Sequence, residues 1–431
     1  MNFRKRLSLL ALTALAVCVL FTFHQFTSLP TLNRAHKQVR NGEVYDQYDE
    51  RDAQMSHIVR PLRRPRPGEQ VWGRKGVYKP WEIFTREITK DYMYTEDAPY
   101  MGALLDSLGT AEIANTTMFR GGSQVKLYFT LADGSRAIVK PMRKSRDFIY
   151  EVTEPFWLDQ ERHNAEIASF HLDRVLNLRR VPPCAGRVIN MTREILEKTK
   201  DEELLKTFFT NKDGNLCFIG KCAPWFCNDE HPICGKREMM EVSLCQYLPM
   251  YKDGSIPVFE KEYPWSQGIK ESKIWKAKNV CRNLLKDEKF LVGRYLLDLI
   301  ELGIFDFFIR NYDRHHFDQL RQFGKESFVA FIDNGKGFGN PKPEADDKTF
   351  LAPVYQCCKI RNSTYERLKL LTQKEYLLSD LLRHSLSYDL LSPVLTEDHF
   401  MSMDRRLQIV IETVDKCIEK HGTDFVLVDH L

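Results

Sequence analysis

Apolar and polar residues alternate most regularly between Gln124 and Pro141, where the chain reads QVKLYFTLADGSRAIVKP. The two alternating runs are separated by Asp133-Gly134, and this arrangement predicts a β-hairpin. The preceding segment, Arg120-Gly121-Gly122-Ser123, predicts a turn. From the residues alone, that turn could be an ordinary loop or a glycine turn that covers phosphates.

Two later segments have the pattern of helices. Residues 161–178, ERHNAEIASFHLDRVLNL, repeat apolar residues at helical spacing and predict a helix that Glu161 opens. Residues 290–309 are apolar almost all the way round, which predicts a helix buried in the larger part of the domain. Asp313 would lie just beyond the end of this second helix.

Two aspartates follow apolar runs. Asp313 lies in FDFFIRNYDRHHFD, and Asp333 follows the strand pattern of residues 328–332 in ESFVAFIDNGKGFG. Protein kinases use one such aspartate to orient the acceptor hydroxyl and the next to hold the metal that bridges the nucleotide phosphates. Taken singly, each could be a helix cap or part of an Asn-Gly turn. Their order along the chain favours the catalytic interpretation.

The order of other polar residues also fits a kinase. Lys140 ends the second strand of the hairpin, where a kinase places the lysine that holds the nucleotide phosphates. Glu161 follows it in the position of the acidic residue on the next helix. A solvated lysine and a carboxylate that complements the helix dipole are the structural alternatives. The chain has no GxGxxGxV loop, HRD triplet or DFG triplet, so it is not an ordinary protein kinase.

The amino terminus predicts entry into the secretory pathway. Three basic residues, 4–6, precede an uncharged apolar run from Leu7 to Phe23. This pattern predicts a cytosolic tail at residues 1–6 and an uncleaved signal anchor at residues 7–26, with the rest of the chain in the lumen. Residues 27–79 are polar and rich in basic residues and proline, which predicts a lumenal stem. The basic run at residues 60–66 is either a processing site or a plain linker.

Length and charge narrow the class of protein. The chain after the stem, roughly 350 residues, is long enough for two lobes. The net charge of +4 and the pI of 8.4 do not indicate a nucleic-acid-binding protein. A Golgi membrane protein of this topology could be a glycosyltransferase, but such enzymes typically need an Asp-x-Asp motif, and the sequence contains none.

The eleven cysteines agree with an oxidising compartment. One, Cys18, lies in the apolar run, and Cys184 and Cys245 stand apart from the others. Four crowd into a polar segment that could bind zinc, but they lack the paired CxxC spacing of a zinc ribbon, so disulfides are favoured. The sequence also contains three Asn-x-Ser/Thr sites compatible with glycosylation, at Asn115, Asn190 and Asn362.

Several strings resemble one family. RHNAEIASFHLDR, CFIGKC, NYDRHHF, DNGKGFG and YQCCKIR are similar to the secretory-pathway kinases that include Golgi casein kinase, the glycosaminoglycan xylosylkinase and an inactive pseudokinase. The resemblance extends from about residue 80 to the end of the chain. It implies an α+β, bilobal, atypical kinase fold stabilised by disulfides, with an amino-terminal lobe at residues 80–249 and a carboxy-terminal lobe at residues 250–431. It also implies an ATP site that uses manganese (Mn2+).

The resemblance assigns roles to matching residues. Asp313 would be the catalytic base, Asp333 a metal and nucleotide ligand, and Glu161 a metal ligand. The other implied nucleotide contacts are Gln124, Lys140, Asp318 and the hinge residues Cys245, Gln246, Tyr247 and Leu248. The implied disulfides are Cys217–Cys234, Cys222–Cys227, Cys281–Cys357 and Cys358–Cys417.

The chain departs from the family pattern at three places. Asp318 stands where a glutamate is usual, Val242 stands where a glycine is usual, and the second cysteine loop is one residue longer. Glu161 is intact, whereas the pseudokinase branch has glutamine there, and a metal clamp needs negative charge. Some segments resemble the protein-kinase branch, while LSPVLTEDHF and MDRRLQ resemble the pseudokinase branch.

We therefore expect a type II membrane kinase whose folded domain lies in the Golgi lumen. A processed and secreted form is the alternative. It would transfer the ATP γ-phosphate to serine in Ser-x-Glu contexts of secreted proteins. Phosphorylation of xylose in the proteoglycan linkage region and a role as a non-catalytic partner are the alternatives. The expected partners are secreted protein substrates or that linkage glycan, the membrane through the anchor, and a second copy or a family pseudokinase. No nucleic acid is expected.

Overall fold

The computed structural model describes residues 55–64, 78–150, 158–249, 257–267, 273, 275–276, 278–343 and 347–430, and the backbone of four short strands before residue 78. The chain divides into two units, Met1–Gln54 and Met55–Leu431. In the first unit, β1 (Val39–Arg40) pairs antiparallel with β2 (Glu43–Val44). The predicted tail and signal anchor, residues 1–26, lie outside the described residues. Within the described residues, no helix is both long and apolar enough to span a membrane.

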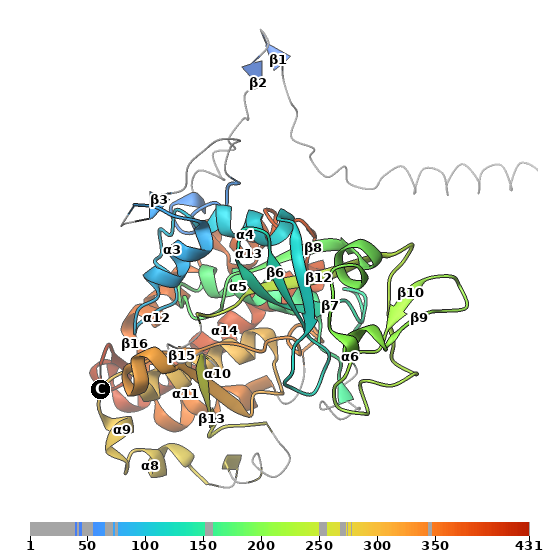
Figure 1. The fold of residues 1–431 in the computed structure, drawn as a ribbon. Coiled ribbons are helices and arrows are strands. Elements are labelled where there is room, and N and C mark those ends of the chain that lie inside the picture. Colours follow the sequence, from blue (N-terminus) through green and yellow to red (C-terminus); the bar gives the residue numbers. More distant parts are fainter. Residues whose placement is uncertain are drawn as a thin grey trace, which may run out of the picture. The chain divides into compact units, whose positions relative to one another are not determined.

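A five-stranded antiparallel sheet forms the amino-terminal half of the second unit (Figure 1). Its strands run in the order β5 (Ile113–Met118), β6 (Leu127–Leu131), β7 (Arg136–Pro141), β12 (Met239–Gln246) and β8 (Cys184–Asn190). Strands β6 and β7 are the predicted hairpin. Gly134 in their turn has φ +88°, a conformation that glycine adopts without steric cost.

Helix α5 (His163–Val175) and helix α4 (Met101–Thr110) pack on this sheet. The predicted helix at residues 161–178 is therefore present but shorter. Glu161 does not open it, because Arg162 before the first helical residue has an extended backbone with φ −112°. The carboxylate of Glu161 thus belongs to the loop that leads into α5.

Helices form most of the carboxy-terminal half of the second unit. The predicted buried helix is α10 (Tyr295–Ile309), in which every residue from Leu296 onward is buried. The prediction began too early, because Gly293 with φ +85° separates α10 from the short helix α9 (Glu288–Leu291). Helix α10 contacts α11 (Ala352–Cys357) and α14 (Glu397–His421), and α14 also contacts α13 (Leu378–Leu386).

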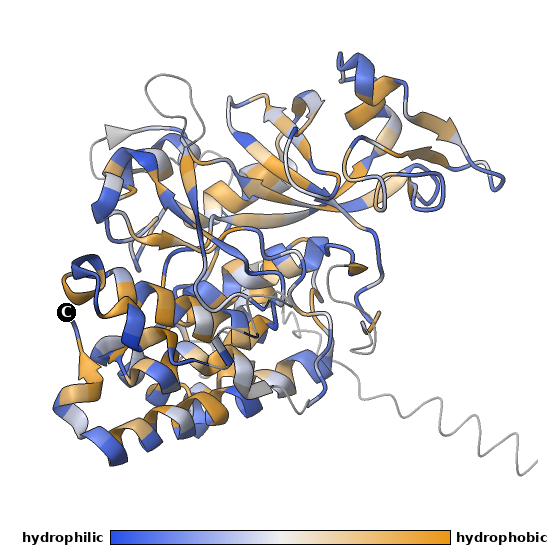
Figure 2. Cartoon of the chain, turned by 90° about the horizontal axis from the view of Figure 1, so that it is seen from below, coloured by the Kyte–Doolittle hydropathy of each residue, from blue (hydrophilic) through white to orange (hydrophobic). Residues whose placement is uncertain are grey.

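A second sheet lies beside α10 and carries the predicted strand before Asp333. It contains β13 (Val258–Glu262), β14 (His316–Leu320) and β15 (Val329–Ala330) in that order, paired antiparallel. In Figure 2, apolar residues run along the strands and the central helices, and many of the connecting turns are hydrophilic. The two halves of this unit are therefore both built around apolar cores.

The remaining elements are short or peripheral. They are α3 (Pro80–Glu87), α6 (Glu202–Leu205), α8 (Val280–Leu284), α12 (Asn362–Leu370), α15 (Thr423–Val426), β3 (Trp72–Gly73), β4 (Gly76–Val77), β9 (Phe208–Thr210), β10 (Leu216–Phe218), β11 (Ile233–Cys234), β16 (Ile360–Arg361), β17 (Leu427–Val428), a π-helix at Met191–Leu196 and 3-10 helices at Arg321–Glu326, Asp347–Leu351 and Lys374–Tyr376.

Part of the predicted stem belongs to the folded unit. Met55, Val59 and Leu62 are buried in its core. The guanidinium of Arg367 also donates a hydrogen bond to the carbonyl oxygen of Ile58. Residues 55–64, which the sequence interpretation assigned to the stem, therefore pack against the folded unit, and the boundaries of the stem stay a prediction.

Five disulfides join described cysteines. Four of them are the pairs that the family resemblance implies, Cys217–Cys234, Cys222–Cys227, Cys281–Cys357 and Cys358–Cys417. The fifth joins Cys184 on β8 to Cys245 on β12, which are direct cross-strand neighbours. The sequence interpretation left these two cysteines unpaired, because 61 residues separate them and only the sheet register brings them together.

We expect peptide mapping of a non-reduced digest to recover all five pairs, with Cys357 and Cys358 linked to different peptides. Removing one native disulfide typically costs roughly 2–5 kcal/mol of folding free energy, so reductant should lower the melting temperature markedly. A reduced digest is the control. Recovery of Cys184 and Cys245 as free thiols, or zinc bound to the four cysteines of residues 217–234, would contradict this pairing.

Candidate active site

Asp333 lies where the strand of the second sheet ends. It has φ +60°, so the chain turns sharply here and enters the loop Asn334–Gly339. Its carboxylate is 55% exposed and meets two lysines of the hairpin. The Nζ of Lys140 lies 2.6 Å from Asp333 Oδ1, and the Nζ of Lys126 lies 3.1 Å from Asp333 Oδ2. Asp333 therefore joins the second sheet to the first.

The same two lysines contact two more carboxylates. The Nζ of Lys140 lies 3.0 Å from Glu161 Oε2 and 2.5 Å from Glu166 Oε1, and the Nζ of Lys126 lies 3.7 Å from Glu161 Oε1. Apart from Asp333, these side chains are nearly buried. The result is a cluster of two ammonium groups and three carboxylates, which we call the lysine–carboxylate cluster.

Sequence reasoning found only part of this cluster. It predicted Lys140, Glu161 and Asp333 and missed Lys126 and Glu166. Glu166 is the carboxylate that lies on α5 itself, the place that the sequence interpretation gave to Glu161. Lys126 and Gln124 are two residues apart, so on an extended strand their side chains point to the same face. This spacing was the sequence signal that could have predicted Lys126 as a site residue.

The cluster changes the acidity of its members. Burial alone would raise the pKa of Asp333, but the ammonium groups of Lys126 and Lys140 hold it well below its ordinary value. Burial would lower the pKa of Lys140, whereas the charges of Asp333, Glu161 and Glu166 raise it well above its usual range. The pKa of Lys126 is raised for the same reason. All three groups are therefore charged at neutral pH.

Gln124 holds the loop that carries Glu161. Its side-chain amide donates to the carbonyl oxygen of Asp159 at 3.0 Å and accepts from the backbone N–H of Glu161 at 2.9 Å. Arg162 adds a double contact to the Asp159 carboxylate at 2.8 Å. The structure thus gives Gln124 a role in positioning Glu161, and its predicted nucleotide contact stays a prediction.

Glycines allow the loop after Asp333 to approach the cluster. A Cβ at Gly335 would lie 2.8 Å from Lys140 Nζ and 3.0 Å from the Glu161 side chain. A Cβ at Gly339 would lie 3.1 Å from the Arg162 guanidinium. The carbonyl oxygen of Gly335 also accepts a hydrogen bond from the Arg162 N–H at 2.7 Å. Side chains at these positions would push the loop away from the lysines.

Asp313 lies three residues beyond the left-handed Arg310 that ends α10. Its backbone N–H donates to Asn311 Oδ1 at 3.1 Å, and the Nδ2 of Asn311 donates to the carbonyl oxygen of Asp333 at 3.4 Å. The Asp313 carboxylate is 30% exposed and pairs with Lys336, whose Nζ lies 3.1 Å from Oδ2. Asn311 therefore ties the two predicted catalytic aspartates together.

Arg314 connects the loops that carry Asp313 and Asp333. Its guanidinium donates to the Asp306 carboxylate, to the carbonyl oxygen of Ile332 and to Asn334 Oδ1, the last at 2.7 Å. Burial raises the pKa of Asp306 to about 6 against the opposing charge of Arg314. The sequence interpretation did not single out Arg314 as a brace, because its partners lie on three different segments.

Asp318 is on β14 and is 7% exposed. Its Oδ1 atom has no hydrogen-bond partner among the described residues. Burial raises the pKa of Asp318 to about 7, with Arg314 opposing the rise and with Glu260 and Asp333 adding to it. Asp318 is thus a buried carboxyl group close to the cluster and poised to accept or lose a proton near neutrality.

The predicted hinge residues lie at the end of β12, next to the strand of Lys140. Cys245 pairs with Ile138 and Gln246 with Ala137, and the N–H of Tyr247 donates to the carbonyl oxygen of Arg136 at 2.8 Å. Leu248 is buried, and no described residue forms a hydrogen bond with the Oε1 of buried Gln246. Val242, the departure from a usual glycine, is buried on the same strand opposite Pro141.

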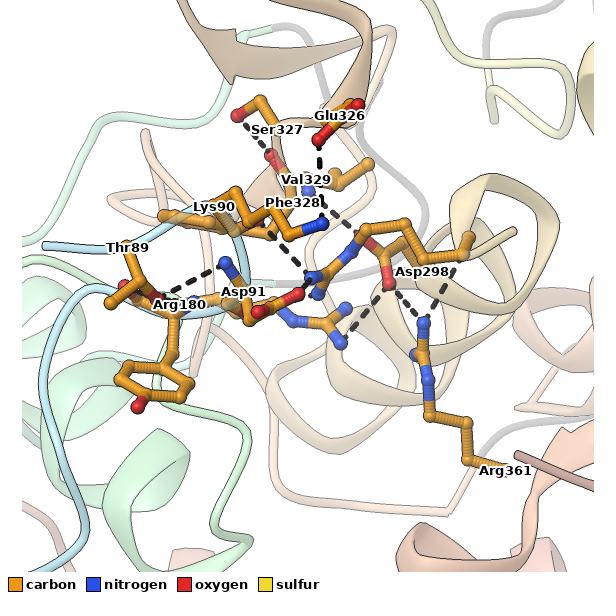
Figure 3. A network of polar contacts seen from close by, with 12 residues as sticks. Thr89, Lys90, Asp91, Arg180, Asp298, Glu326, Ser327, Phe328, Val329 and Arg361 are labelled. Carbon is orange, nitrogen blue, oxygen red and sulfur yellow. Dashed lines mark hydrogen bonds and ion pairs between the residues drawn. The ribbon is translucent and has the colours of Figure 1, made fainter. Parts of the chain in front are cut away.

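A buried ion network holds the strand that leads to Asp333 (Figure 3). Asp298 on α10 accepts the N–H of Val329 at 3.0 Å and pairs with Arg180 at 3.1 Å, Arg294 at 2.8 Å and Arg361 at 2.5 Å. Burial would raise the pKa of Asp298, but these arginines lower it to about 2. The neighbouring Phe328 N–H donates to the carbonyl oxygen of Lys90. Strand β15 is thus fixed just before Asp333.

The cluster fits a metal that takes further ligands from phosphates. Within the described residues, no three His, Cys, Asp or Glu side chains are arranged as a complete metal site. Hard cations in phosphotransferases are often bound by one or two carboxylates plus substrate phosphates. Glu161 and Asp333 supply two such carboxylates. Among the described residues Glu161 Oε2 has no hydrogen-bond partner, although it forms an ion pair with Lys140, so it retains capacity for a cation.

The three predicted glycosylation sites lie away from these side chains along the sequence. Asn115 is on β5, Asn190 ends β8 and Asn362 begins α12, and all three are partly exposed. Their glycosylation stays a prediction.

Comparison with known proteins identifies the relatives of this chain. Residues 79–426 match the family model described as Golgi casein kinase, C-terminal, Fam20. The chain is 39% identical over 358 residues to the extracellular serine/threonine protein kinase FAM20C of Homo sapiens, covering 82% of this chain and 60% of that protein. It is 40% identical over 345 residues to the pseudokinase FAM20A of Homo sapiens, covering 79% and 61%.

The chain is also 36% identical over 356 residues to the glycosaminoglycan xylosylkinase of Homo sapiens, covering 82% of this chain and 84% of that protein. It spans about three fifths of the length of the first two relatives. A crystal structure of the Golgi casein kinase with Mn/ADP bound aligns with a TM-score of 0.77 and 35% identity, covering 82% of this chain and 84% of that chain. The predicted family and the α+β kinase-like fold are thereby confirmed.

We expect Asp318→Asn to be more stable than the wild type above pH 7 and nearly equal to it below about pH 4. Asp318 loses its proton near pH 7 in the folded protein, whereas an aspartate in the unfolded chain loses it near pH ~3.9. Between these values the unfolded state binds fewer protons, so wild-type stability falls relative to the variant as pH rises.

The measurement is denaturant unfolding at a series of pH values, without metal or nucleotide. Asp213→Asn, which removes an exposed carboxylate on the turn between β9 and β10, is the matched control. A stability difference for Asp318→Asn that does not vary with pH would contradict the prediction.

Proposed function

We propose that this chain, which belongs to the Fam20 family, is an active manganese-dependent kinase that transfers the ATP γ-phosphate to serine in Ser-x-Glu contexts of secretory-pathway proteins. The observation that carries the proposal is the joint placement of Asp313 and Asp333. Asn311 and Arg314 tie their loops together, and Lys126 and Lys140 bring the hairpin to Asp333. A phosphotransferase needs this proximity between a base and a phosphate-binding group.

Glu161 and Asp333 would hold the metal. The metal would neutralise charge on the phosphates and orient them for in-line transfer. The presence of a glutamate at position 161 supports activity, because the family resemblance implies glutamine in the pseudokinase branch. Binding of a cation to these carboxylates would also release Lys126 and Lys140 from part of their ion pairing, and both ammonium groups could then contact phosphate oxygens.

Asp313 would orient the acceptor hydroxyl and accept its proton. The bond between the serine oxygen and the γ-phosphorus forms as the bond to the bridging oxygen of ATP breaks, and ADP leaves. Lys336 is paired with Asp313 and would keep its carboxylate aimed while the acceptor enters. Gln124 and the segment Cys245 to Leu248 would contact the nucleotide, and Asp318 would contact it through a carboxyl group one methylene shorter than the usual glutamate.

Two alternatives share the same machinery. A xylose hydroxyl needs the same base and metal, and the glycosaminoglycan xylosylkinase is a relative. A non-catalytic partner is represented by the pseudokinase relative. Protein serine is favoured by the sequence segments that resemble the protein-kinase branch. We place the enzyme in the Golgi lumen, held by the predicted anchor or released from it, where it could pair with a second copy or a family pseudokinase.

We expect Asp313→Ala to retain manganese and nucleotide binding but to lose phosphate transfer by about 10²–10⁴-fold, the range typical of a general base. Asp333→Ala should lose both metal and nucleotide binding. The assay is radiolabelled transfer from ATP to a Ser-x-Glu peptide, with titration calorimetry for nucleotide binding. Asp213→Asn is the control and should behave as wild type. Normal transfer by the Asp313→Ala or the Asp333→Ala variant would refute the kinase assignment.

We expect the purified lumenal domain to label a Ser-x-Glu peptide more efficiently than a galactosyl-xylose acceptor at equal concentration. The catalytic residues are common to both reactions, so kcat/KM for each acceptor is the deciding measurement. Asp313→Ala serves as the background control for both. Strong labelling of the glycan alone would reverse the choice of acceptor, and labelling of neither would favour the non-catalytic alternative.

A further inference from the structure

A disulfide closes the loop Cys222–Cys227, which lies against the residues that flank the predicted hairpin. Two contacts fix it there. The N–H of Ala223 donates to the carbonyl oxygen of Ser123 in the glycine turn at 3.1 Å. The guanidinium of Arg143 donates to the carbonyl oxygen of Phe226 at 3.4 Å. The loop is therefore anchored to the turn that precedes the hairpin and to the segment that follows it.

Two adjacent aromatic residues of this loop face different surroundings. Phe226 is 3% exposed, and the Nζ of Lys336 lies 5.9 Å from its ring centroid. Lys336 is the ion-pair partner of Asp313, so Phe226 lies near the ammonium group that pairs with the proposed base. Trp225 is 59% exposed, with its ring centroid 6.4 Å from that of Phe226. The disulfide-closed loop thus places one aromatic ring near the partner of the proposed base and exposes the adjacent aromatic ring.

The same region carries positive charge that forms no ion pair with a carboxylate of the described residues. Arg143 donates to the carbonyl oxygens of Phe226 and His231, and its Nη2 atom has no hydrogen-bond partner in the part of the chain that the structure describes. No salt bridge joins Arg143 or the neighbouring Lys144 to a carboxylate of the described residues. Burial lowers the pKa of Arg143, and the charge of Glu161 opposes the shift. Arg143 is partly buried, and a guanidinium without a carboxylate partner would be stabilised by an incoming carboxylate.

We propose that the loop Cys222–Cys227 is the docking wall for the acceptor, with Trp225 as the apolar contact and Arg143 as the cation that receives an acidic side chain. The partner that fits this surface is an extended acidic polypeptide. Tryptophan supplies a large contact area at low conformational cost, and arginine binds carboxylates with two parallel hydrogen bonds. This inference rests on the proposed function, because it assumes that Asp313 accepts the proton of a serine in that polypeptide.

The direct test is Trp225→Ala. Because Trp225 is largely exposed, this change should leave the melting temperature nearly unchanged, whereas KM for a Ser-x-Glu peptide should rise about tenfold, the loss typical of a well-placed aromatic contact. KM for ATP should stay within about twofold of wild type, since the contact is made only by the acceptor. Trp225→Phe should recover part of the affinity. Unchanged peptide KM in Trp225→Ala would overturn the proposal.

Phe209→Ala is the matched control. Phe209 is also an exposed aromatic residue, 38% exposed, and lies on β9, in the small sheet whose strands β10 and β11 flank the loop of Trp225. It should not affect the KM of either substrate. An equal rise in peptide KM for Phe209→Ala would show a general disturbance of this sheet and would overturn the role of Trp225.

Arg143→Gln tests the charge. This variant should raise KM for the Ser-x-Glu peptide several-fold and should affect a Ser-x-Gln peptide much less, because only the first peptide brings a carboxylate. An equal effect on both peptides would remove Arg143 from the acceptor site. A rise in KM by Trp225→Ala for a galactosyl-xylose acceptor, with no change for the peptide, would assign the wall to a glycan and would overturn the polypeptide assignment.

A binding measurement separates failure of this inference from failure of the proposed function. The anisotropy of a fluorescently labelled Ser-x-Glu peptide gives its Kd without catalysis. If the wild type binds the peptide and Trp225→Ala weakens binding, the docking wall stands even if no phosphate is transferred. If transfer occurs and Trp225→Ala binds as tightly as wild type, the kinase assignment stands and the docking wall is refuted.

Discussion

The attraction between two buried ammonium groups and three carboxylates organises this molecule. Lys126 and Lys140 come from one hairpin, Glu161 and Glu166 from the loop and helix that follow it, and Asp333 from the second sheet. Charges of this kind are stable away from water only when they are paired. The glycines of the loop after Asp333 leave room for this close approach, and the amide of Gln124 holds the loop that carries Glu161. The two sheets are thus connected by the ion pairs of Asp333 with Lys126 and Lys140.

The sequence was sufficient for the parts of the site that follow from local patterns. Alternation located the hairpin and therefore Lys140, and apolar runs located Asp313 and Asp333 at their ends. The approximate position of α5 followed from its helical period. These features depend on neighbours in the sequence, so periodicity and turn chemistry are enough to find them. The family resemblance then added four of the five disulfide pairs that join described cysteines.

Other features depend on register and tertiary contact, which a single sequence does not specify. Lys126 and Lys140 meet the same aspartate only because the hairpin brings their strands side by side. Glu161 was expected on the helix, but the helix begins at His163, and Glu166 is the helical carboxylate at Lys140. The three arginines around Asp298 come from positions 180, 294 and 361, so no local pattern could connect them.

The disulfide between Cys184 and Cys245 forms only in an oxidising compartment, and it lies next to the predicted nucleotide-binding segment. It joins two neighbouring strands at the residue that directly precedes Gln246 and Tyr247. A chain synthesised in a reducing cytosol would lack this disulfide between β8 and β12. Recombinant material from such a source and material from an oxidising host therefore differ covalently next to the predicted hinge, even when their sequences agree. For this protein, the choice of expression host is part of the definition of the sample.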